Sequence, residues 1–315
     1  MRILFMGTPD FAEESLRALI KDGRNVVGVV TNPDKPKGRG HKMMKPPVKI
    51  LAEEAGIPVW QPTTLKDGAF QEVLDDLQPD VIAVVAYGKI LPPYIINYPK
   101  YGCVNVHGSL LPKYRGAAPI QRSVIDGEKY AGITTMLMDE GLDTGDMLLV
   151  EKVEIGSDET SQQLFDRLSV IGGELLLKTL DGLYENSITP IPQDDTKATY
   201  AAMIKKEEAL IDWAKDSTTI CNLVRGMNSW PMAYTYYKGE PVKIISSTEC
   251  AEDAKKPFGT ILGLEKNKGL KVACLGGSVY IKEVQFAGSR RMNIEDYMRG
   301  HEITIGEVLS SNQMS

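Results

Sequence analysis

Residues 102–146 read GCVNVHGSLLPKYRGAAPIQRSVIDGEKYAGITTMLMDEGLDTGD, and this stretch indicates both the fold class and the site of the protein. It opens as a short apolar strand that carries Asn105 and His107 just before a Gly-Ser turn. Alternation with a period of two places these two polar side chains on the same face of the strand. A second loop, residues 139–146, adds further carboxylates. We therefore predict that the two loops form the two sides of one active site.

Strands alternate with helices along the chain around this stretch. Sheets built in this way are mostly parallel, carry helices on both faces and bind ligands beyond the carboxyl ends of their strands. Because Asn105 and His107 lie at that end of their strand, we predict an α/β fold with a Rossmann-like, mostly parallel sheet. We expect Asp10 to cap the first helix. The patterns predict strands at 2–7, 26–30, 82–86, 103–106 and 147–153, and helices at 10–21, about 67–77 and 160–184.

Familiar cofactor motifs are absent from the sequence. The turn after the first strand, Gly7-Thr8-Pro9, lacks the G-x-G-x-x-G pattern of dinucleotide-binding proteins, and no G-x-x-x-x-G-K-[ST] loop for ATP occurs. The four cysteines show no C-x-x-C spacing, so we expect neither a disulfide framework nor a metal site. No run of 18 apolar residues is present. We expect a cytoplasmic protein that binds no membrane.

Basic residues gather in one stretch, although the whole chain has a formal charge of −6. Residues 33–49, PDKPKGRGHKMMKPPVK, hold six Lys or Arg residues against one Asp, together with four prolines. The prolines and glycines predict an irregular loop. A solvated surface loop is the alternative, but long basic loops in compact domains tend to bind ligands, and this one suits a phosphate backbone.

The pattern of predicted elements changes to short strands and turns after a Pro-rich polar segment at 189–206, which we predict to be a linker. It separates a first domain, 1–188, from a second domain, 207–315. Short strands and Gly-containing turns predict that the second domain is a small OB-like β-barrel, an architecture that often binds oligonucleotides. Arg290 and Arg291 are a candidate basic edge of this barrel, and ordinary surface charge is the alternative.

Asn105, His107 and Asp143 form a set that suits acyl transfer. The Asn105 amide donates hydrogen bonds without ionising, as an oxyanion hole requires, and His107 can donate to the same oxygen or move a proton. Asp143 can hold the imidazole and accept a proton. No activated nucleophile accompanies this set, because Ser109 lacks a G-x-S-x-G context and Cys103 lies within the strand. We therefore expect direct transfer to an acceptor on the substrate, without a covalent enzyme intermediate.

Several motifs of the chain resemble the 10-formyltetrahydrofolate-dependent formyltransferases, and most closely the branch of that family that formylates methionyl-tRNA. Together they cover essentially the whole chain, and their combination is highly specific. The motifs are Phe5-Met6-Gly7-Thr8-Pro9-Asp10-Phe11, Gly38-Arg39-Gly40, Asn105-x-His107, Ser109-Leu110-Leu111-Pro112-x-Tyr114-Arg115-Gly116-Ala117-Ala118-Pro119-Ile120, Asp139-x-Gly141-x-Asp143-Thr144-Gly145, Asn228-Ser229-Trp230-Pro231 and Arg290-Arg291-Met292.

This resemblance implies transfer of the formyl group of 10-formyltetrahydrofolate to methionyl initiator tRNA by a monomeric enzyme without a metal. It implies catalytic roles for Asn105, His107 and Asp143. Two alternatives are left open: a sugar-amine formyltransferase and a non-catalytic RNA-binding relative. We expect folate contacts at Tyr87, Gly88, Lys89, Ile90, Leu91, Ser109, Leu110, Leu111, Pro112 and Asp139. We expect tRNA contacts at Lys37, Arg39, Lys42, Lys45, Arg290 and Arg291.

Overall fold

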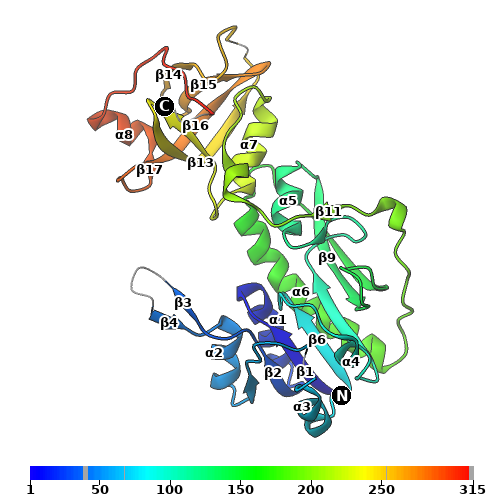
Figure 1. The fold of residues 1–315 in the computed structure, drawn as a ribbon. Coiled ribbons are helices and arrows are strands. Elements are labelled where there is room, and N and C mark those ends of the chain that lie inside the picture. The colour runs from blue at the N-terminus through cyan, green and yellow to red at the C-terminus, as the bar shows by residue number, and fades with distance from the viewer. Residues whose placement is uncertain (38–41, 67, 253, 312–315) are drawn as a thin grey trace. The chain divides into compact units, whose positions relative to one another are not determined.

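Two compact units make up the protein, whose computed structural model describes residues 1–37, 42–66, 68–252 and 254–311. Figure 1 shows the fold. No helix of the described residues is long and apolar enough to cross a membrane. The domain limits predicted from the sequence stay a prediction. Unit 1 comprises Met1–Pro119, Ala131–Val153 and Phe165–Ala201, and unit 2 comprises Ile120–Tyr130, Glu154–Leu164 and Ala202–Ser315.

Unit 1 is built on a seven-stranded sheet in the order β10-β9-β7-β6-β1-β2-β5. The pairs from β7 through β5 are parallel, whereas β9 runs antiparallel to β7. The predicted α/β class with a mostly parallel sheet is therefore confirmed. The strands are β1 Arg2–Gly7, β2 Asn25–Val30, β5 Val59–Trp60, β6 Val81–Val85, β7 Cys103–His107, β9 Tyr130–Leu137 and β10 Met147–Glu154.

The helices α1, α2, α3, α4 and α6 accompany this sheet (Figure 1). α1 begins at Asp10 itself and no side chain caps it, so the predicted capping role of Asp10 is wrong. Its carboxylate lies in the first helical turn instead, where the helix dipole favours a negative charge. The helices are α1 Asp10–Lys21, α2 Pro47–Glu54, α3 Gln71–Leu77, α4 Pro93–Ile96 and α6 Ser161–Tyr184.

Packing on the sheet follows from the alternation of side chains along its strands. Ile82 of β6 is fully buried in a core that it shares with Leu74 of α3 and Ile95 of α4. α6 approaches α1 closely at Gly173, where an added Cβ would lie 3.0 Å from the Cβ of Ala18. These contacts fix the sheet that carries Asn105 and His107.

The basic stretch 33–49 contains regular structure, so the predicted irregular loop is wrong. β3 (Lys35–Lys37) and β4 (Lys42–Met44) form a two-stranded antiparallel hairpin, and α2 begins at Pro47. A two-stranded sheet consists of edges alone, and edges tolerate lysine and proline. Pro47 occupies the first turn of α2, where its missing N–H is not needed. The prolines therefore mark a strand edge and a helix start.

Unit 2 contains an antiparallel sheet in the order β12-β13-β16-β15-β14, with β17 paired to β16. The chain near its C-terminus joins the two ends of this sheet. Ser310 bridges Tyr236 of β12, and Val308 bridges Thr260 just before β14. This closure confirms the predicted small β domain. Its elements are α7 Ser217–Gly226, β12 Tyr234–Tyr237, β13 Glu240–Cys250, β14 Ile261–Glu265, β15 Gly269–Cys274, β16 Gly277–Phe286, β17 Met292–Asn293 and α8 Ile294–Gly300. α5 (Pro119–Ile125) lies between β8 (Arg115–Gly116) and β9 in the chain.

The segment predicted as a linker also contains short regular elements. A 3₁₀ turn spans Asp195–Lys197, and a second one spans Lys206–Ala209. Between them, β11 (Tyr200–Ala201) pairs in parallel with β8 (Arg115–Gly116). The part of this segment that precedes residue 202 is therefore hydrogen-bonded into unit 1.

Candidate active site

β7 carries Asn105 and His107 to the carboxyl end of the parallel part of the sheet. Asn105 pairs with Val84 of β6 on one side and with Met136 of β9 on the other. His107 pairs with Thr134 of β9, and its side chain is almost completely buried, with a side-chain exposure of 7%. The two polar side chains follow each other at an interval of two residues, so they share one face of the strand, as the sequence predicts.

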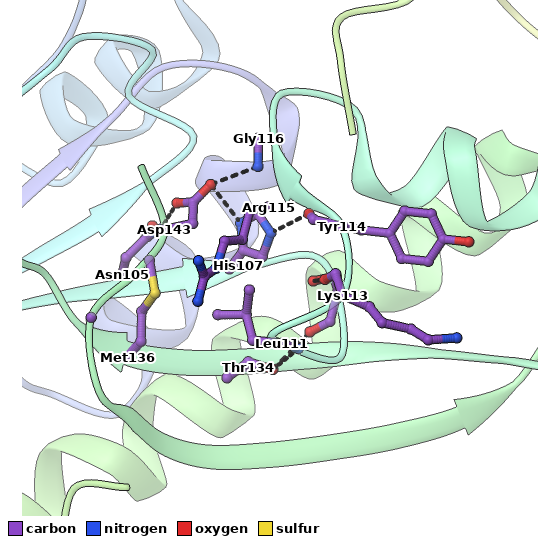
Figure 2. A network of polar contacts seen from close by, with 12 residues as sticks. Asn105, His107, Leu111, Lys113, Tyr114, Arg115, Gly116, Thr134, Met136 and Asp143 are labelled. Carbon is purple, nitrogen blue, oxygen red and sulfur yellow. Dashed lines mark hydrogen bonds and ion pairs between the residues drawn. The ribbon is translucent and has the colours of Figure 1, made fainter. Parts of the chain in front are cut away.

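A backbone carbonyl orients the His107 ring. The Nε2 atom lies 2.9 Å from the carbonyl oxygen of Tyr114. Because a carbonyl oxygen only accepts hydrogen bonds, Nε2 carries a proton and donates it there. Tyr114 has a φ of 61°, a left-handed conformation that costs a non-glycine residue about 1–3 kcal/mol. The remaining ring nitrogen, Nδ1, faces Asp143 (Figure 2).

Asp143 joins this pair from the second loop. Its Oδ2 atom lies 3.8 Å from Nδ1 of His107 and accepts a 2.8 Å hydrogen bond from the backbone N–H of Gly116. Its Oδ1 atom lies 3.4 Å from Nδ2 of Asn105. Asp143 itself has a φ of 54°. The structure thus brings Asn105, His107 and Asp143 together (Figure 2), although the carbonyl of Tyr114, and not Asp143, holds the imidazole by a short hydrogen bond.

The turn after β7 is held by one buried hydroxyl. Thr134 of β9 donates from Oγ1 to the carbonyl oxygen of Ser109 at 2.7 Å and accepts from the N–H of Leu111 at 3.1 Å. Ser109 donates from its own hydroxyl to the carbonyl oxygen of Lys113 at 2.6 Å. The Ser109 hydroxyl therefore closes the turn, in agreement with the absence of a nucleophile motif, and the expected folate contacts at 109–112 stay a prediction.

The segment 87–91 follows β6 at the same end of the sheet. Tyr87 is 2% exposed, its hydroxyl has no hydrogen-bond partner within the described chain, and burial raises the pKa of that hydroxyl to about 12. The Asn32 side chain donates to the carbonyl oxygen of Tyr87 at 2.8 Å and so ties this segment to the end of β2. Leu91 is a core residue and Ile90 is exposed.

Lys89 has a structural contact in this segment. Its ammonium donates to the carbonyl oxygens of Pro62 and Thr63, at 2.7 and 3.1 Å. Burial, with a smaller effect of the nearby Lys35, lowers the pKa of the Lys89 ammonium. Contacts of folate with this segment stay a prediction.

Asp139, another expected folate contact, stabilises its own loop. Its carboxylate accepts from the Thr144 hydroxyl at 2.7 Å and from the N–H of Gly141 at 3.0 Å. Asx-type contacts of this kind shape tight turns, and here they shape the loop that presents Asp143. A contact between Asp139 and folate is not tested by this arrangement.

The expected tRNA-binding residues are only partly described by the structure. Arg39 lies outside the described residues, as do the side chains of Lys37 and Lys42 in the hairpin. Lys45 pairs with Glu53 at 2.6 Å, which raises the pKa of the Lys45 ammonium. In unit 2, Arg290 is exposed, while Arg291 pairs with Glu283. Roles of these residues in tRNA binding stay a prediction.

Gln193 and Arg115 are site residues to which the sequence assigns no role, although Arg115 lies within one of the family motifs. The Gln193 amide donates to the carbonyl oxygens of Asp143 and Gly145, both at 2.8 Å. Arg115, which is 2% exposed, donates to the Gln193 side-chain oxygen. Gln193 lies 50 residues from Asp143 in a segment read as a linker, so only the folded chain reveals this contact. Among the described residues, no three His, Cys, Asp or Glu side chains gather as metal ligands would.

Comparisons with known proteins agree with this arrangement. The family model described as formyl transferase matches residues 1–180, and the one described as formyl transferase, C-terminal domain, matches residues 203–302. The chain is 50% identical over 310 residues to a methionyl-tRNA formyltransferase of Clostridium novyi, covering 98% of this chain and 100% of that one. It is 51% identical over 310 residues to one of Acetivibrio thermocellus, covering 98% and 99%.

Solved structures with the same fold are more distant in sequence. An N-formyltransferase from Helicobacter canadensis, in complex with folinic acid and dTDP-3-aminofucose, has a TM-score of 0.67 at 20% identity, with 89% of this chain and 98% of that chain covered. HypX from Aquifex aeolicus, in complex with tetrahydrofolic acid, has a TM-score of 0.61 at 17% identity, with 95% and 47% covered. At these identities, the two similarities establish the fold alone.

Proposed function

The chain belongs to the methionyl-tRNA formyltransferase family, and on that basis we propose that it transfers the formyl group of 10-formyltetrahydrofolate to the α-amine of methionyl initiator tRNA. The observation that carries the proposal is the meeting of Asn105, His107 and Asp143 at the carboxyl end of β7. The three groups supply two hydrogen-bond donors and one carboxylate, which direct transfer to an amine requires.

The two donors stabilise the tetrahedral intermediate. When the amine attacks the formyl carbon, the formyl oxygen takes up negative charge. Nδ2 of Asn105 donates to this oxyanion, as preorganised donors do in other acyl transfers. Because Nε2 of His107 already donates to Tyr114, Nδ1 becomes a second donor to the oxyanion only when the ring carries a second proton. The Nε2 bond to Tyr114 fixes the direction of Nδ1 before the substrate arrives.

Asp143 removes the proton that the attacking nitrogen must lose. Its carboxylate is the only member of the three that is a pure acceptor when ionised. The bond from Gly116 occupies one lone pair of Oδ2, and the long 3.4 Å contact with Asn105 leaves Oδ1 weakly bound. Collapse of the intermediate breaks the bond between the formyl carbon and the departing folate nitrogen. That nitrogen takes up the proton that Asp143 removed from the amine, and the carboxylate is restored.

A folate as the formyl donor is supported by the family and by the folate-bound structures of the same fold. The chain offers groups of the right kind near the site. The Tyr87 hydroxyl, a buried polar group without a hydrogen-bond partner among the described residues, belongs to the segment that follows β6 at the same end of the sheet. The turn at residues 109–112 lies next to His107 and is held rigidly by Thr134. These residues would bind and orient the donor.

Methionyl-tRNA is proposed as the formyl acceptor because the relatives that match the chain over nearly its full length are named methionyl-tRNA formyltransferase. The basic hairpin of unit 1 suits a polyanion, because its sequence is rich in lysine and Lys35 is exposed. The small β domain of unit 2 has an architecture that often binds oligonucleotides. We propose both as tRNA-contacting regions.

Formyl transfer from radiolabelled 10-formyltetrahydrofolate tests the proposal, with methionyl initiator tRNA, methionyl elongator tRNA and an amino-sugar nucleotide as parallel acceptors. We expect label in the initiator tRNA and little in the other two. Label in the amino sugar alone would replace the proposal by a sugar-amine formyltransferase. Salt-sensitive RNA binding without any transfer of label would indicate a non-catalytic relative.

A further inference from the structure

Residues 191–201, which we call the strap, contact the Asp143 loop through Gln193 and are bound to unit 1 at both ends. At one end, Ile191 exchanges two backbone hydrogen bonds of 2.8 Å with Met147 at the start of β10. At the other end, β11 pairs with β8, and the N–H of Arg115 donates to the carbonyl oxygen of Thr199 at 2.8 Å. The strap is therefore a fixed part of unit 1.

Gln193, in the middle of the strap, uses the full hydrogen-bonding capacity of its side chain. Its Nε2 atom donates to the carbonyl oxygens of Asp143 and Gly145, both at 2.8 Å. Its Oε1 atom accepts from Nε and Nη2 of Arg115, at 3.1 and 2.9 Å. The reverse orientation of the amide would place oxygen against two carbonyls and N–H against a cation, so the orientation is unique.

These contacts close a ring around Asp143. Arg115 and Gly116 are neighbours in β8, and Gly116 donates to the Asp143 carboxylate at 2.8 Å. Gln193 holds the Asp143 backbone and is itself held by Arg115. Both the carboxylate and the backbone of Asp143 are thus bound through β8 and Gln193.

We propose that Gln193 is a positioning residue that sets the place of the Asp143 carboxylate through its backbone. The inference rests on the proposed function, in which Asp143 takes the proton of the amine. Asp143 and Tyr114 both adopt left-handed φ values, so their loops need contacts from outside to stay in place. Gln193 supplies those contacts for the Asp143 loop.

Two substitutions remove the contacts in different ways. Gln193→Met keeps the length of the side chain and loses all four hydrogen bonds. Gln193→Glu keeps acceptors for Arg115 but turns a carboxylate toward the carbonyl oxygens of Asp143 and Gly145. We expect kcat to fall about 10- to 100-fold in both, as for a misplacement on the order of 1 Å. KM for both substrates should change less than about threefold.

A double-mutant cycle separates positioning from general stability. In an Asp143→Asn background, Gln193→Met should change kcat less than about twofold, because the group that it positions is already impaired. The same multiplicative loss in both backgrounds would overturn the proposal. So would a normal kcat per folded molecule for both single variants, combined with a lower melting temperature.

A crystal structure of the Gln193→Glu variant supplies a readout that does not need activity. We expect the Asp143 carboxylate to leave the N–H of Gly116. An unmoved carboxylate would overturn the positioning role. If the wild-type protein formylated no tRNA, the proposed function would fail, while this structure would still decide whether Gln193 places Asp143.

Discussion

The Asp143 loop and the basic hairpin belong to the same unit but differ in construction. The Asp143 carboxylate is 14% exposed and accepts a hydrogen bond from Gly116, while the strap holds the Asp143 backbone. The hairpin is a two-stranded ribbon whose Met43 and Met44 side chains are exposed. The loop is organised before any substrate binds, as a catalytic group must be, whereas the hairpin presents side chains that a partner would cover.

The largest effect should follow from removing the charge of the organised loop. Asp143→Asn keeps an oxygen for the N–H of Gly116 but cannot accept the amine proton. We expect kcat to fall about 10²- to 10⁴-fold, the usual contribution of a general base, with KM little changed. Steady-state formyl transfer measures this. Glu140→Gln, an exposed carboxylate of the same loop, is the matched control and should lose less than about twofold. Equal rates for both variants would contradict the proposed role.

The next effect concerns the framework beneath the site. Thr134→Val keeps the shape of a fully buried side chain but leaves the N–H of Leu111 and the carbonyl of Ser109 without their partner. The free energy of unfolding of unit 1 should fall by about 1–3 kcal/mol. Urea unfolding measures it. The exposed Thr63→Val should change it by less than about 0.5 kcal/mol. If the two variants had the same free energy of unfolding, the turn would not depend on Thr134.

A smaller effect should come from the hairpin side of the comparison. Lys45→Ala removes one charge next to β4. We expect KM for methionyl-tRNA to rise about two- to fivefold with kcat unchanged, and the salt dependence of binding to weaken by about one charge. The exposed Lys66→Ala, outside the hairpin, should leave both quantities unchanged. A loss of kcat in Lys45→Ala would indicate that the hairpin contributes to the chemistry as well.

The smallest effect on kcat is expected for the solvent-exposed ion-pair partner of Arg115. Asp195, the second partner of Arg115, is 81% exposed at its side chain. Exposed ion pairs contribute little, and Gln193 still holds the guanidinium when this partner is gone. Asp195→Asn should therefore keep kcat within about twofold of the wild type in steady-state assays. A loss as large as that of Gln193→Met would shift the positioning role from the amide to the ion pair.

Local patterns predicted the parts of the fold and site that depend on neighbouring residues. The strand before His107 and the polar pair with Asn105 follow from period-two alternation, and the helix at 161–184 follows from its apolar stripe. The prediction of an irregular loop for β3 and β4 is wrong, because proline, which disfavours regular structure in general, is tolerated at a strand edge.

Contacts between distant residues could not be predicted in this way. The bond from Gln193 to Asp143 and the bridge from Ser310 to Tyr236 join segments whose pairing no local pattern encodes. The carbonyl of Tyr114 orients His107 through a left-handed residue, which the sequence does not indicate either.

The single-turnover rate of formyl transfer to methionyl initiator tRNA, compared between the wild type and Asn105→Ala, tests the central claim most directly. Loss of one oxyanion donor should slow the chemical step about 10²- to 10³-fold, equivalent to roughly 2.7–4 kcal/mol. An unchanged rate in Asn105→Ala would contradict the account, because the oxyanion would then be stabilised elsewhere.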